Sequence, residues 1–374
     1  MLNAGFIGMG RMGITHYSIL NTHPSVKVLA IADTSKTMRN ILDKYLSVDT
    51  FSDYRQMIEN TPLDFVVVST PTDSHAEVIN FALAHGIHVF TEKPLAMTPA
   101  ESGAVVALAE KRQLVNQVGY VNRFNEVFVE VKRLLDSGAI GDLKSFTSEM
   151  YGATVLKGSN ATWRSKRKSG GGCMYEFASH CLDLVVYFLG QPDRVAGSVL
   201  KSIYSSHVED MVTSTLIYDS GLSGTVTVNW SDESFRKPAN IVSFFGSRGK
   251  IIADKHAFKI FLKEDQPQIG FHEGWNTRYI TDFARSVRVY VRGNEFTRQL
   301  DYFVDAILER KVDNPAGFSE GHETDVLMDK ITIDAASVAN PGTLQPDAPP
   351  TVTGLSSKPS FWKKISKRMG TKHA

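Results

Sequence analysis

Three glycines near the start of the chain, Gly8, Gly10 and Gly13, interrupt an otherwise apolar segment, GFIGMGRMG. A short apolar run, 3–7, precedes them, and a helical pattern follows them. The next apolar run, VKVLAIAD, ends in Asp33, 20 residues after Gly13. A glycine motif alone is a weak signal. Between two strands, opening a helix and followed by an acid at this distance, it is typical of a dinucleotide-binding unit.

The glycines have separate physical roles in such a unit. Gly8 permits the tight turn, Gly10 lets the backbone approach a pyrophosphate, and Gly13 lets the helix pack closely on the sheet. The N-terminus of the helix, at Arg11 and Met12, offers free N–H groups and positive potential to phosphates. These five residues are therefore predicted to bind a cofactor.

Asp33 bears on the choice of cofactor. Its carboxylate would accept hydrogen bonds from the adenosine ribose hydroxyls and would repel a 2′-phosphate. Thr34 and Ser35 follow it, so no arginine directly after it could bind that phosphate. The sequence therefore favours NAD(H) over NADP(H).

Apolar and helical segments continue to alternate through the first third of the chain. Strands are predicted at 62–71, in HVFTEKPLA and in LVNQVGY, with helices over 74–84 and from Thr98–Pro99 onward. At the start of the second helix, Thr98 suits the N-cap and Pro99 the first helical position. This alternation predicts an α/β fold that begins with a Rossmann domain, a doubly wound parallel sheet. Ligands of such sheets lie beyond the carboxyl ends of the strands. The residues predicted there, beside the cofactor, are Ser69, Thr70, Pro71, His75, Glu92, Lys93, Pro94 and Tyr120.

The pattern changes after Gly141. Strands are predicted at 143–151, 194–203, 209–218, 222–230, 240–246, 249–253 and 258–263, and helices at about 125–136, 174–189, 295–310 and 321–339. Strands without intervening helices predict a C-terminal α+β domain with an open, largely antiparallel sheet. An open face is commonly buried against a partner, so a homodimer or homotetramer is expected.

The last part of the chain has a different composition. From about Pro341 it is rich in Pro, Gly, Thr and Ser, and it ends in the basic segment FWKKISKRM. We predict a dinucleotide-binding domain over 1–121, a substrate and oligomerisation domain over 122–340, and a disordered linker with a basic tail over 341–374. The tail is either a short amphipathic segment for an anionic membrane or partner, or a solvated end, and the second is favoured because nine residues form only a marginal helix.

Composition excludes several classes of protein. Six of the 41 Lys and Arg but only one of the 40 Asp and Glu follow residue 340, so the remainder is mildly acidic and unsuited to nucleic acid. No apolar run is long enough to span a membrane and no signal peptide is recognisable, which predicts a cytoplasmic protein. The two cysteines are expected to be buried and reduced.

The segment GGGCMYEFASHCLDL, 170–184, carries Glu176, His180 and Asp183 at spacings that place them on one helical face. A metal site of two carboxylates and one histidine is less favoured, because a single helix offers these groups side by side, and we predict no metal. A purely structural polar helix is the other alternative.

Five motifs in this order, GFIGMGRMG, STPTDSH, EKPLA, GYVNRFN and GGG followed by His180 and Asp183, resemble the Gfo/Idh/MocA oxidoreductases over about residues 3–340. The resemblance implies a two-domain subunit, a nicotinamide cofactor and sugar-like or polyol substrates. By resemblance Lys93 matches the family's lysine and His180 its histidine, and Asp183 matches a common acidic position. Glu176 stands where many members have an aspartate.

The chemistry of alcohol oxidation agrees with these positions. A base must take the hydroxyl proton as hydride leaves, and His180 suits this role. A cation beside the oxygen stabilises alkoxide character, which suits Lys93. Glu176 and Asp183 are predicted to orient the substrate or the histidine.

The segment WRSKRKSGGG, 163–172, leads into the stretch with Glu176 and His180 and carries four cations in five residues. They would bind an anionic group, or they form a solvated basic loop. In the family a Trp-Arg pair at this place can approach the cofactor, which implies that role for Trp163 and Arg164. Tyr120 and Arg123 are candidate substrate residues near the domain junction, although Arg123 could equally form an interdomain salt bridge.

These observations predict an NAD(H)-dependent dehydrogenase that oxidises a secondary hydroxyl of a cyclic sugar, a sugar derivative or an inositol. A sugar derivative here includes nucleotide-linked or acidic ones. Two alternatives remain: a non-catalytic NAD-binding regulatory protein, and a carbonyl reductase of a non-sugar substrate.

Overall fold

The computed structural model describes residues 1–158 and 163–337. The predicted linker and basic tail lie outside the described residues. The first layer is a six-stranded parallel sheet in the order β3-β2-β1-β4-β5-β6. Its strands are β1 (Leu2–Ile7), β2 (Val26–Ala32), β3 (Asp49–Phe51), β4 (Phe65–Val68), β5 (His88–Thr91) and β6 (Asn116–Val118). The order reverses between β1 and β4, which places a ligand crevice at their carboxyl ends.

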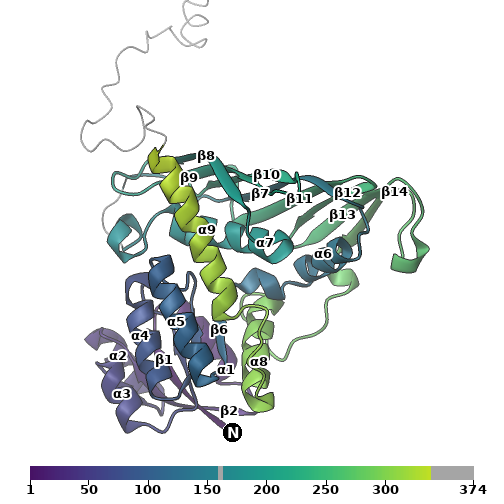
Figure 1. Ribbon diagram of the computed structural model, residues 1–374. Helices are drawn as coiled ribbons and strands as arrows, with labels where there is room; N and C mark the ends of the chain where they lie inside the picture. Colours follow the sequence, from purple (N-terminus) through teal and green to yellow (C-terminus); the bar gives the residue numbers. More distant parts are fainter. Residues whose placement is uncertain (159–162, 338–374) are drawn as a thin grey trace, which may run out of the picture. The chain divides into compact units, whose positions relative to one another are not determined.

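Helices cover both faces of this sheet (Figure 1). One face packs against α3 (Tyr54–Asn60), α4 (His75–Ala84) and α5 (Pro99–Arg112). The other packs against α1 (Arg11–Leu20), α2 (Lys36–Tyr45) and α8 (Asn294–Glu309). As predicted, Thr98 caps α5, and its hydroxyl accepts a hydrogen bond from the Glu101 N–H.

Helix α8 comes from the far end of the described chain, yet it completes the first layer. Its Phe303 ring lies edge-on to Phe65 of β4 and Phe90 of β5, with centroids 5.5 and 5.8 Å away. All three rings are fully buried. A late segment of the chain therefore supplies part of the core that supports the strand ends of the first sheet.

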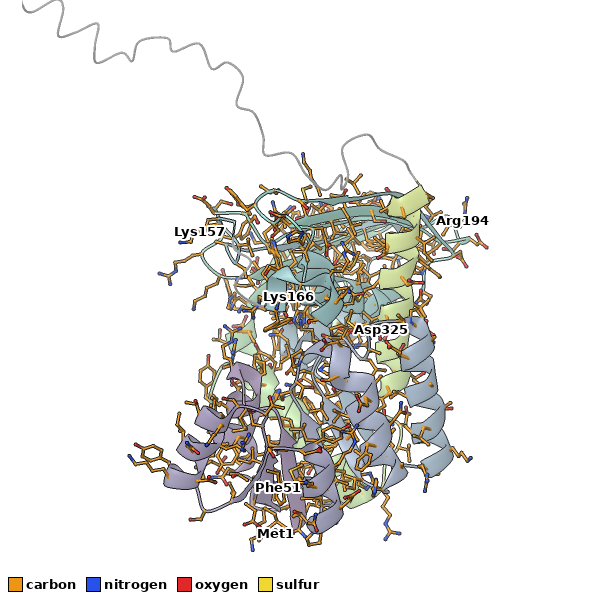
Figure 2. All side chains as sticks on the ribbon, turned by 90° about the vertical axis from the view of Figure 1, so that its left-hand side faces the viewer. Met1, Phe51, Lys157, Lys166, Arg194 and Asp325 are labelled. Atoms are coloured by element: carbon orange, nitrogen blue, oxygen red, sulfur yellow. The ribbon has the colours of Figure 1, made fainter. Side chains whose placement is uncertain are left out.

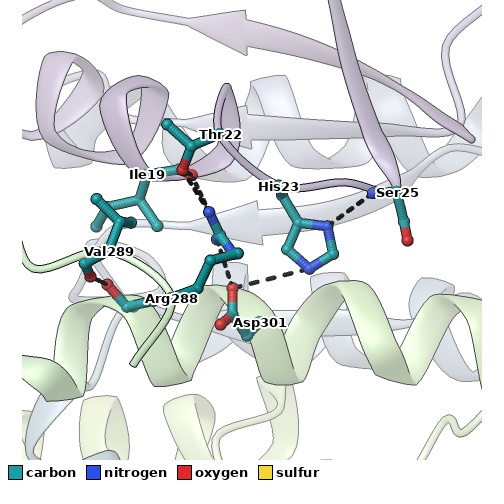
Figure 3. A network of polar contacts seen from close by, with 8 residues as sticks. Ile19, Thr22, His23, Ser25, Arg288, Val289 and Asp301 are labelled. Carbon is teal, nitrogen blue, oxygen red and sulfur yellow. Dashed lines mark hydrogen bonds and ion pairs between the residues drawn. The ribbon is translucent and has the colours of Figure 1, made fainter. Parts of the chain in front are cut away.

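Residues 283–293, here called the connecting segment, lead into α8 and are fastened to α1. Arg288 donates to the Ile19 carbonyl at 3.2 Å and to the Thr22 hydroxyl, and its other nitrogen binds Asp301 at 2.7 Å (Figure 3). The carbonyl of Val289 accepts from the Thr297 hydroxyl at 2.6 Å. These contacts hold the segment against the C-terminal end of α1.

The second layer is an eight-stranded sheet in the order β14-β13-β12-β11-β7-β10-β9-β8. Every neighbouring pair is antiparallel except β7 and β10. Its strands are β7 (Leu143–Tyr151), β8 (Arg194–Lys201), β9 (Met211–Ile217), β10 (Ser223–Asn229), β11 (Ala239–Gly246), β12 (Gly249–Asp254), β13 (Ala257–Leu262) and β14 (Gly274–Tyr279).

Helices of the second layer lie on one face of this sheet: α6 (Glu126–Asp136), α7 (Ser179–Leu189) and α9 (Phe318–Ser337) (Figure 1). Buried and partly buried positions alternate along the strands, for example in β9, so one face forms the core and the other stays uncovered by any described helix. The predicted fold class, a Rossmann domain joined to an α+β domain with an open, largely antiparallel sheet, is confirmed.

Four local features differ from the prediction. The short edge strand β3 and the terminal strand β14 were not predicted, because β3 has only three residues and β14, GWNTRY, is mostly polar. The strand predicted over 62–71 is confined to β4, since Pro62 and Pro71 bound it. The helix predicted over 174–189 begins with a π-helical turn, Met174–Ala178, before α7.

Candidate active site

One cavity of about 1060 Å³ runs from the glycine loop to the start of α7. The first layer contributes the ends of β1, β2, β4 and β5, and the second contributes residues around Trp163, Phe177 and Pro238. The predicted site residues on its wall are Gly8, Gly10, Arg11, Met12, Asp33, Ser69, Thr70, Pro71, Glu92, Lys93, Trp163, Arg164, Glu176 and His180. Gly13, His75, Pro94, Tyr120, Arg123 and Asp183 lie behind the wall.

The glycine loop has the geometry that a dinucleotide requires. Gly8 has a φ of +89°, a left-handed conformation that favours glycine, and a Cβ there would lie 2.9 Å from the Ser69 carbonyl oxygen. A Cβ on Gly13 would overlap the Gly8 carbonyl, so close packing of α1 needs this glycine. A Cβ on Gly10 would meet nothing within 4 Å, which leaves open space beside the helix N-terminus. The residues present fit a pyrophosphate in this space.

Asp33 is held at the end of β2 by backbone donors. Its Oδ2 accepts from the Met9 N–H at 2.7 Å and its Oδ1 from the Ser35 N–H at 2.8 Å. Each oxygen keeps a lone pair for a further donor, such as a ribose hydroxyl. Arg39 of α2 binds the Asp33 backbone carbonyl at 2.6 Å, so it reaches this site from outside the motif.

A buried histidine beneath Glu92 was not predicted. His16 of α1 is fully buried, and its Nε2 lies 2.6 Å from Glu92 Oε1. Burial alone would raise the pKa of Glu92, but His16, and then Lys93 and His180, outweigh it and lower that pKa. Glu92 is therefore an anion beside Lys93. No sequence signal links these residues, which are 76 positions apart.

Lys93 joins the two layers at the centre of the cavity. Its Nζ donates to the backbone carbonyls of Glu176 at 3.1 Å and Tyr175 at 3.3 Å, and lies 3.9 Å from the Glu176 carboxylate. Glu176 also faces Arg164, whose Nε is 3.4 Å from its Oε2. Lys93 and Glu176 are largely buried, with 10% and 18% of their side chains exposed. Charges thus alternate in sign from Glu92 through Lys93 and Glu176 to Arg164.

His180 lies on the same wall, one turn beyond Glu176. Burial, and after it the charge of Lys93, lowers the pKa of His180 to about 3, although Glu92 opposes the shift. The imidazole is therefore neutral at physiological pH. Its Nδ1 is buried and has no hydrogen-bond partner within residues 1–158 and 163–337.

Asp183 and Arg123 form a buried ion pair behind the wall. Asp183 Oδ1 accepts from Arg123 Nε at 2.8 Å, and Arg123 also donates to the Pro315 carbonyl at 2.7 Å. Burial raises the pKa of Asp183 to about 6, although Arg123 opposes the shift. Tyr120 is likewise fully buried. The structure brings Glu176 and His180 to the cavity, and it does not bring Asp183 there.

His75 braces the two loops that face the cavity. Its Nδ1 lies 2.9 Å from the Pro94 carbonyl and its Nε2 3.0 Å from the Thr70 carbonyl. Burial lowers the pKa of this histidine. The contacts tie the turn after β4 to the loop that carries Lys93.

Half of the cations of the basic loop, 164–168, are paired with acids of the same chain. Arg164 faces Glu176, and Arg167 binds Glu209, a fully buried acid that also accepts from the Met174 N–H at 2.9 Å. Lys166 and Lys168 are exposed (Figure 2 labels Lys166). Two of the four cations are therefore used to hold the loop in place.

Other features of the described chain bear on the predictions. Cys173 and Cys181 are both buried and free, and burial raises the pKa of each, to about 12 for Cys181. No cluster of three or more His, Cys, Asp or Glu that could hold a metal occurs within 1–158 and 163–337. Among the helices of those residues, none has the length and apolar character to cross a membrane.

Known proteins resemble this chain over most of its length. It is 25% identical to the myo-inositol 2-dehydrogenase of Thermotoga maritima, over 77% of this chain and 84% of that protein. It is 27% identical to the scyllo-inositol 2-dehydrogenase (NAD⁺) of Bacillus subtilis, over 59% of this chain and 65% of that protein. A levoglucosan dehydrogenase solved with NADH and levoglucosan shares the fold, with a TM-score of 0.77 and 22% identity over 90% of this chain and 97% of the other.

Family models match both layers. Residues 2–120 match the oxidoreductase family with an NAD-binding Rossmann fold, and residues 128–252 match the GFO/IDH/MocA C-terminal domain. The glycine loop, Asp33 and the Lys93 loop lie within the first match, and Glu176 and His180 lie within the second. The chain belongs to the Gfo/Idh/MocA family of NAD-dependent oxidoreductases.

Proposed function

We propose that this protein oxidises a secondary hydroxyl of a cyclic sugar, a sugar derivative or an inositol. The observation that carries the proposal is the convergence of Lys93, Glu176 and His180 on the wall of the cavity that also holds the glycine loop and Asp33. The inositol dehydrogenases to which the chain is similar support the substrate class.

Lys93 is the proposed electrophilic group. Its ammonium, held by two backbone carbonyls and faced by Glu176, would donate a hydrogen bond to the reacting oxygen as negative charge develops there. The nicotinamide supplies the hydride acceptor when NAD is bound. Because both carbonyls belong to the π-helical turn, the lysine is positioned by the same segment that carries Glu176.

His180 is the proposed proton acceptor. A neutral imidazole with a pKa of about 3 is a weak base towards an ordinary alcohol. As hydride departs, however, the hydroxyl becomes the O–H of a protonated carbonyl, a far stronger acid, and its proton can pass to the imidazole. The nearby Lys93 charge favours rapid release of that proton, which keeps His180 ready for the next cycle.

Four further residues act in this proposal by positioning others. His16 keeps Glu92 ionised beside Lys93, and Arg164 holds Glu176 against the same lysine. Asp183 and Arg123, which were candidates for substrate contact, would instead fix α7 from behind. Trp163 lies on the cavity wall, where it can contact the cofactor or the substrate.

Assays of NADH formation with NAD and a panel of inositols, aldoses, anhydrosugars, acidic sugars and nucleotide sugars test the proposal. We expect turnover with at least one cyclic polyol or sugar, and its loss in Lys93→Ala. NADH binding without turnover across the panel would instead favour a regulatory NAD-binding protein. Reduction of non-sugar ketones in a parallel NADH-consumption assay would favour the carbonyl reductase.

We also propose a homodimer or homotetramer built on the open face of the second sheet. Phe245 of β11, Phe261 of β13 and Trp275 of β14 follow the strand register across this face, and Phe245 and Trp275 are 49% and 57% exposed. An exposed aromatic row on a sheet favours burial against a second copy. Light scattering of the wild type and of Trp275→Lys tests this, and a monomeric wild type would contradict it.

A further inference from the structure

The connecting segment places an arginine on the cofactor end of the cavity. Arg292 lines the cavity although it lies 280 positions from Met12, which its guanidinium contacts at 3.7 Å through the thioether sulfur. The guanidinium also lies over the Phe296 ring, 5.2 Å from its centroid. Within the described residues, no carboxylate lies within ion-pair distance of it.

The charges around Arg292 leave its cation uncompensated. Arg11 lines the same end of the cavity, and after burial its charge is the main cause that lowers the pKa of Arg292. The first turn of α1 contains no acidic residue. Glu92, whose charge acts in the opposite direction, is already bound to His16. Among the described residues, no carboxylate forms an ion pair with Arg11 or Arg292, so two guanidinium groups and a helix N-terminus line this end of the cavity without a paired anion.

This space is the one that Gly10 leaves open. A helix N-terminus with free N–H groups attracts phosphate, and arginine binds phosphate oxygens through two parallel hydrogen bonds. Repulsion between Arg11 and Arg292 costs free energy in the unliganded protein, and a dianionic pyrophosphate between them would remove that cost.

We propose that Arg292 binds the pyrophosphate of NAD from the connecting segment, complementing the N–H groups at the start of α1. The contacts of Arg288 with Ile19, Thr22 and Asp301 seat the segment that presents it (Figure 3). A residue from the C-terminal part of the chain thereby completes the phosphate site that the glycine motif begins. The cofactor in turn links the connecting segment to α1.

Arg292→Ala and Arg292→Lys, compared with Arg285→Ala, test the assignment. Arg285 lies on the same segment, is exposed and is absent from the cavity wall, so its substitution removes the same charge at a control position. The dissociation constants of NADH, ADP-ribose, ADP and adenosine are measured by titration without substrate. The outcome is therefore independent of which sugar the enzyme uses.

We expect Arg292→Ala to raise the dissociation constants of NADH, ADP-ribose and ADP by about tenfold to a hundredfold, the range for loss of a hydrogen bond to a charged group. Adenosine, which has no phosphate, should bind equally to all variants, and Arg292→Lys should fall between the wild type and the alanine variant. Unchanged NADH binding in Arg292→Ala would overturn the proposal. So would an equal loss for ADP and adenosine, or the same loss in Arg285→Ala.

Discussion

The ammonium of Lys93 lies 3.1 Å from the backbone carbonyl of Glu176, so the loop after β5 and the turn before α7 meet at one cation. Each layer thus contributes half of the proposed reacting centre. The lysine is oriented by the backbone of the segment whose side chains, Glu176 and His180, line the cavity.

Removing the cation tests its chemical role. Lys93→Ala should lower kcat by about a hundredfold or more, because charge on the reacting oxygen loses its donor. The dissociation constant of NADH should change little, since the glycine loop and Asp33 are intact. Lys27→Ala, an exposed lysine of β2, is the matched control. Near-normal kcat in Lys93→Ala would rule out the proposed mechanism.

The contact between Arg164 and Glu176 predicts that substitutions of the two residues have non-additive effects on kcat/KM. Glu176→Gln and Arg164→Ala should each lower kcat/KM, because each loosens the carboxylate that faces Lys93. The double variant should be little worse than the poorer single one, since the residues act through the same contact. Kinetics of the three variants measure the coupling, with Arg194→Ala, an exposed residue at the start of β8, as the control (Figure 2). Fully additive losses would mean that the two residues act separately.

The low pKa of His180 predicts a pH dependence of stability. Between about pH 3 and 6.5 the unfolded chain binds a proton at this histidine and the folded protein does not, so the free energy of unfolding falls as the pH falls. At about pH 5 the loss is at most about 2 kcal/mol. Urea unfolding at about pH 7.5 and 5 should show a smaller loss in His180→Gln than in the wild type and in the control His256→Gln. Equal losses in all three would contradict the burial of this imidazole.

Asp325 of α9 gives a second test of a buried group (Figure 2). Its Oδ2 accepts from the Ala96 N–H at 3.0 Å, in the loop that carries Lys93, and burial raises the pKa of this carboxyl well above its usual value. A protonated carboxyl resembles an amide, so Asp325→Asn should nearly preserve stability at neutral pH. Asp325→Ala, which leaves the Ala96 N–H unpaired, should lower the free energy of unfolding by about 1–3 kcal/mol.

The raised pKa of Asp325 determines how its contribution to the free energy of unfolding changes with pH. The folded protein holds this proton more tightly than the unfolded chain, so its contribution to stability is full below about pH 4 and is lost as the pH rises through the folded value. Asp325→Asn should lack this decline in denaturant titrations across pH. A steeper decline in the variant would show that the carboxyl is ionised when folded.

The contacts of Glu209 with Met174 and Arg167 predict that this acid holds the basic loop in place. Glu209→Ala removes the acceptor of the Met174 N–H and the partner of Arg167, and should lower the free energy of unfolding by about 1–3 kcal/mol. It should also raise KM for the substrate, because the turn leading to Glu176 loses its anchor. Glu233→Ala, an exposed acid, is the control. Unchanged stability and KM would show that the loop is held by other contacts.

Local patterns predicted the parts of the fold that local physics determines. The glycine spacing, the acid at the end of β2 and the Thr98 cap each depend on neighbours in sequence, and the structure has all three. The pairings His16–Glu92, Arg123–Asp183 and Arg167–Glu209 join residues 42 to 76 positions apart. Nothing in the local sequence specifies such partners, because they depend on how elements pack.

The segment with Glu176, His180 and Asp183 shows a limit of helical periodicity as a predictor of which side chains share a site. The three residues share a face on a regular helix, but the structure begins this segment with a π-helical turn and packs α7 against Arg123. Asp183 therefore faces the protein interior while the other two line the cavity. Arg292 carried no motif at all, and only the path of the connecting segment brings it to the glycine loop.

The position of α8 has a consequence for synthesis of the chain. When a ribosome has made the first sheet, the rings of Phe65 and Phe90 still lack Phe303, which comes more than 200 residues later. That face would stay exposed to water through most of translation, a state prone to aggregation. A nascent chain arrested before α8 should therefore recruit chaperones, and release of the completed chain should end that dependence.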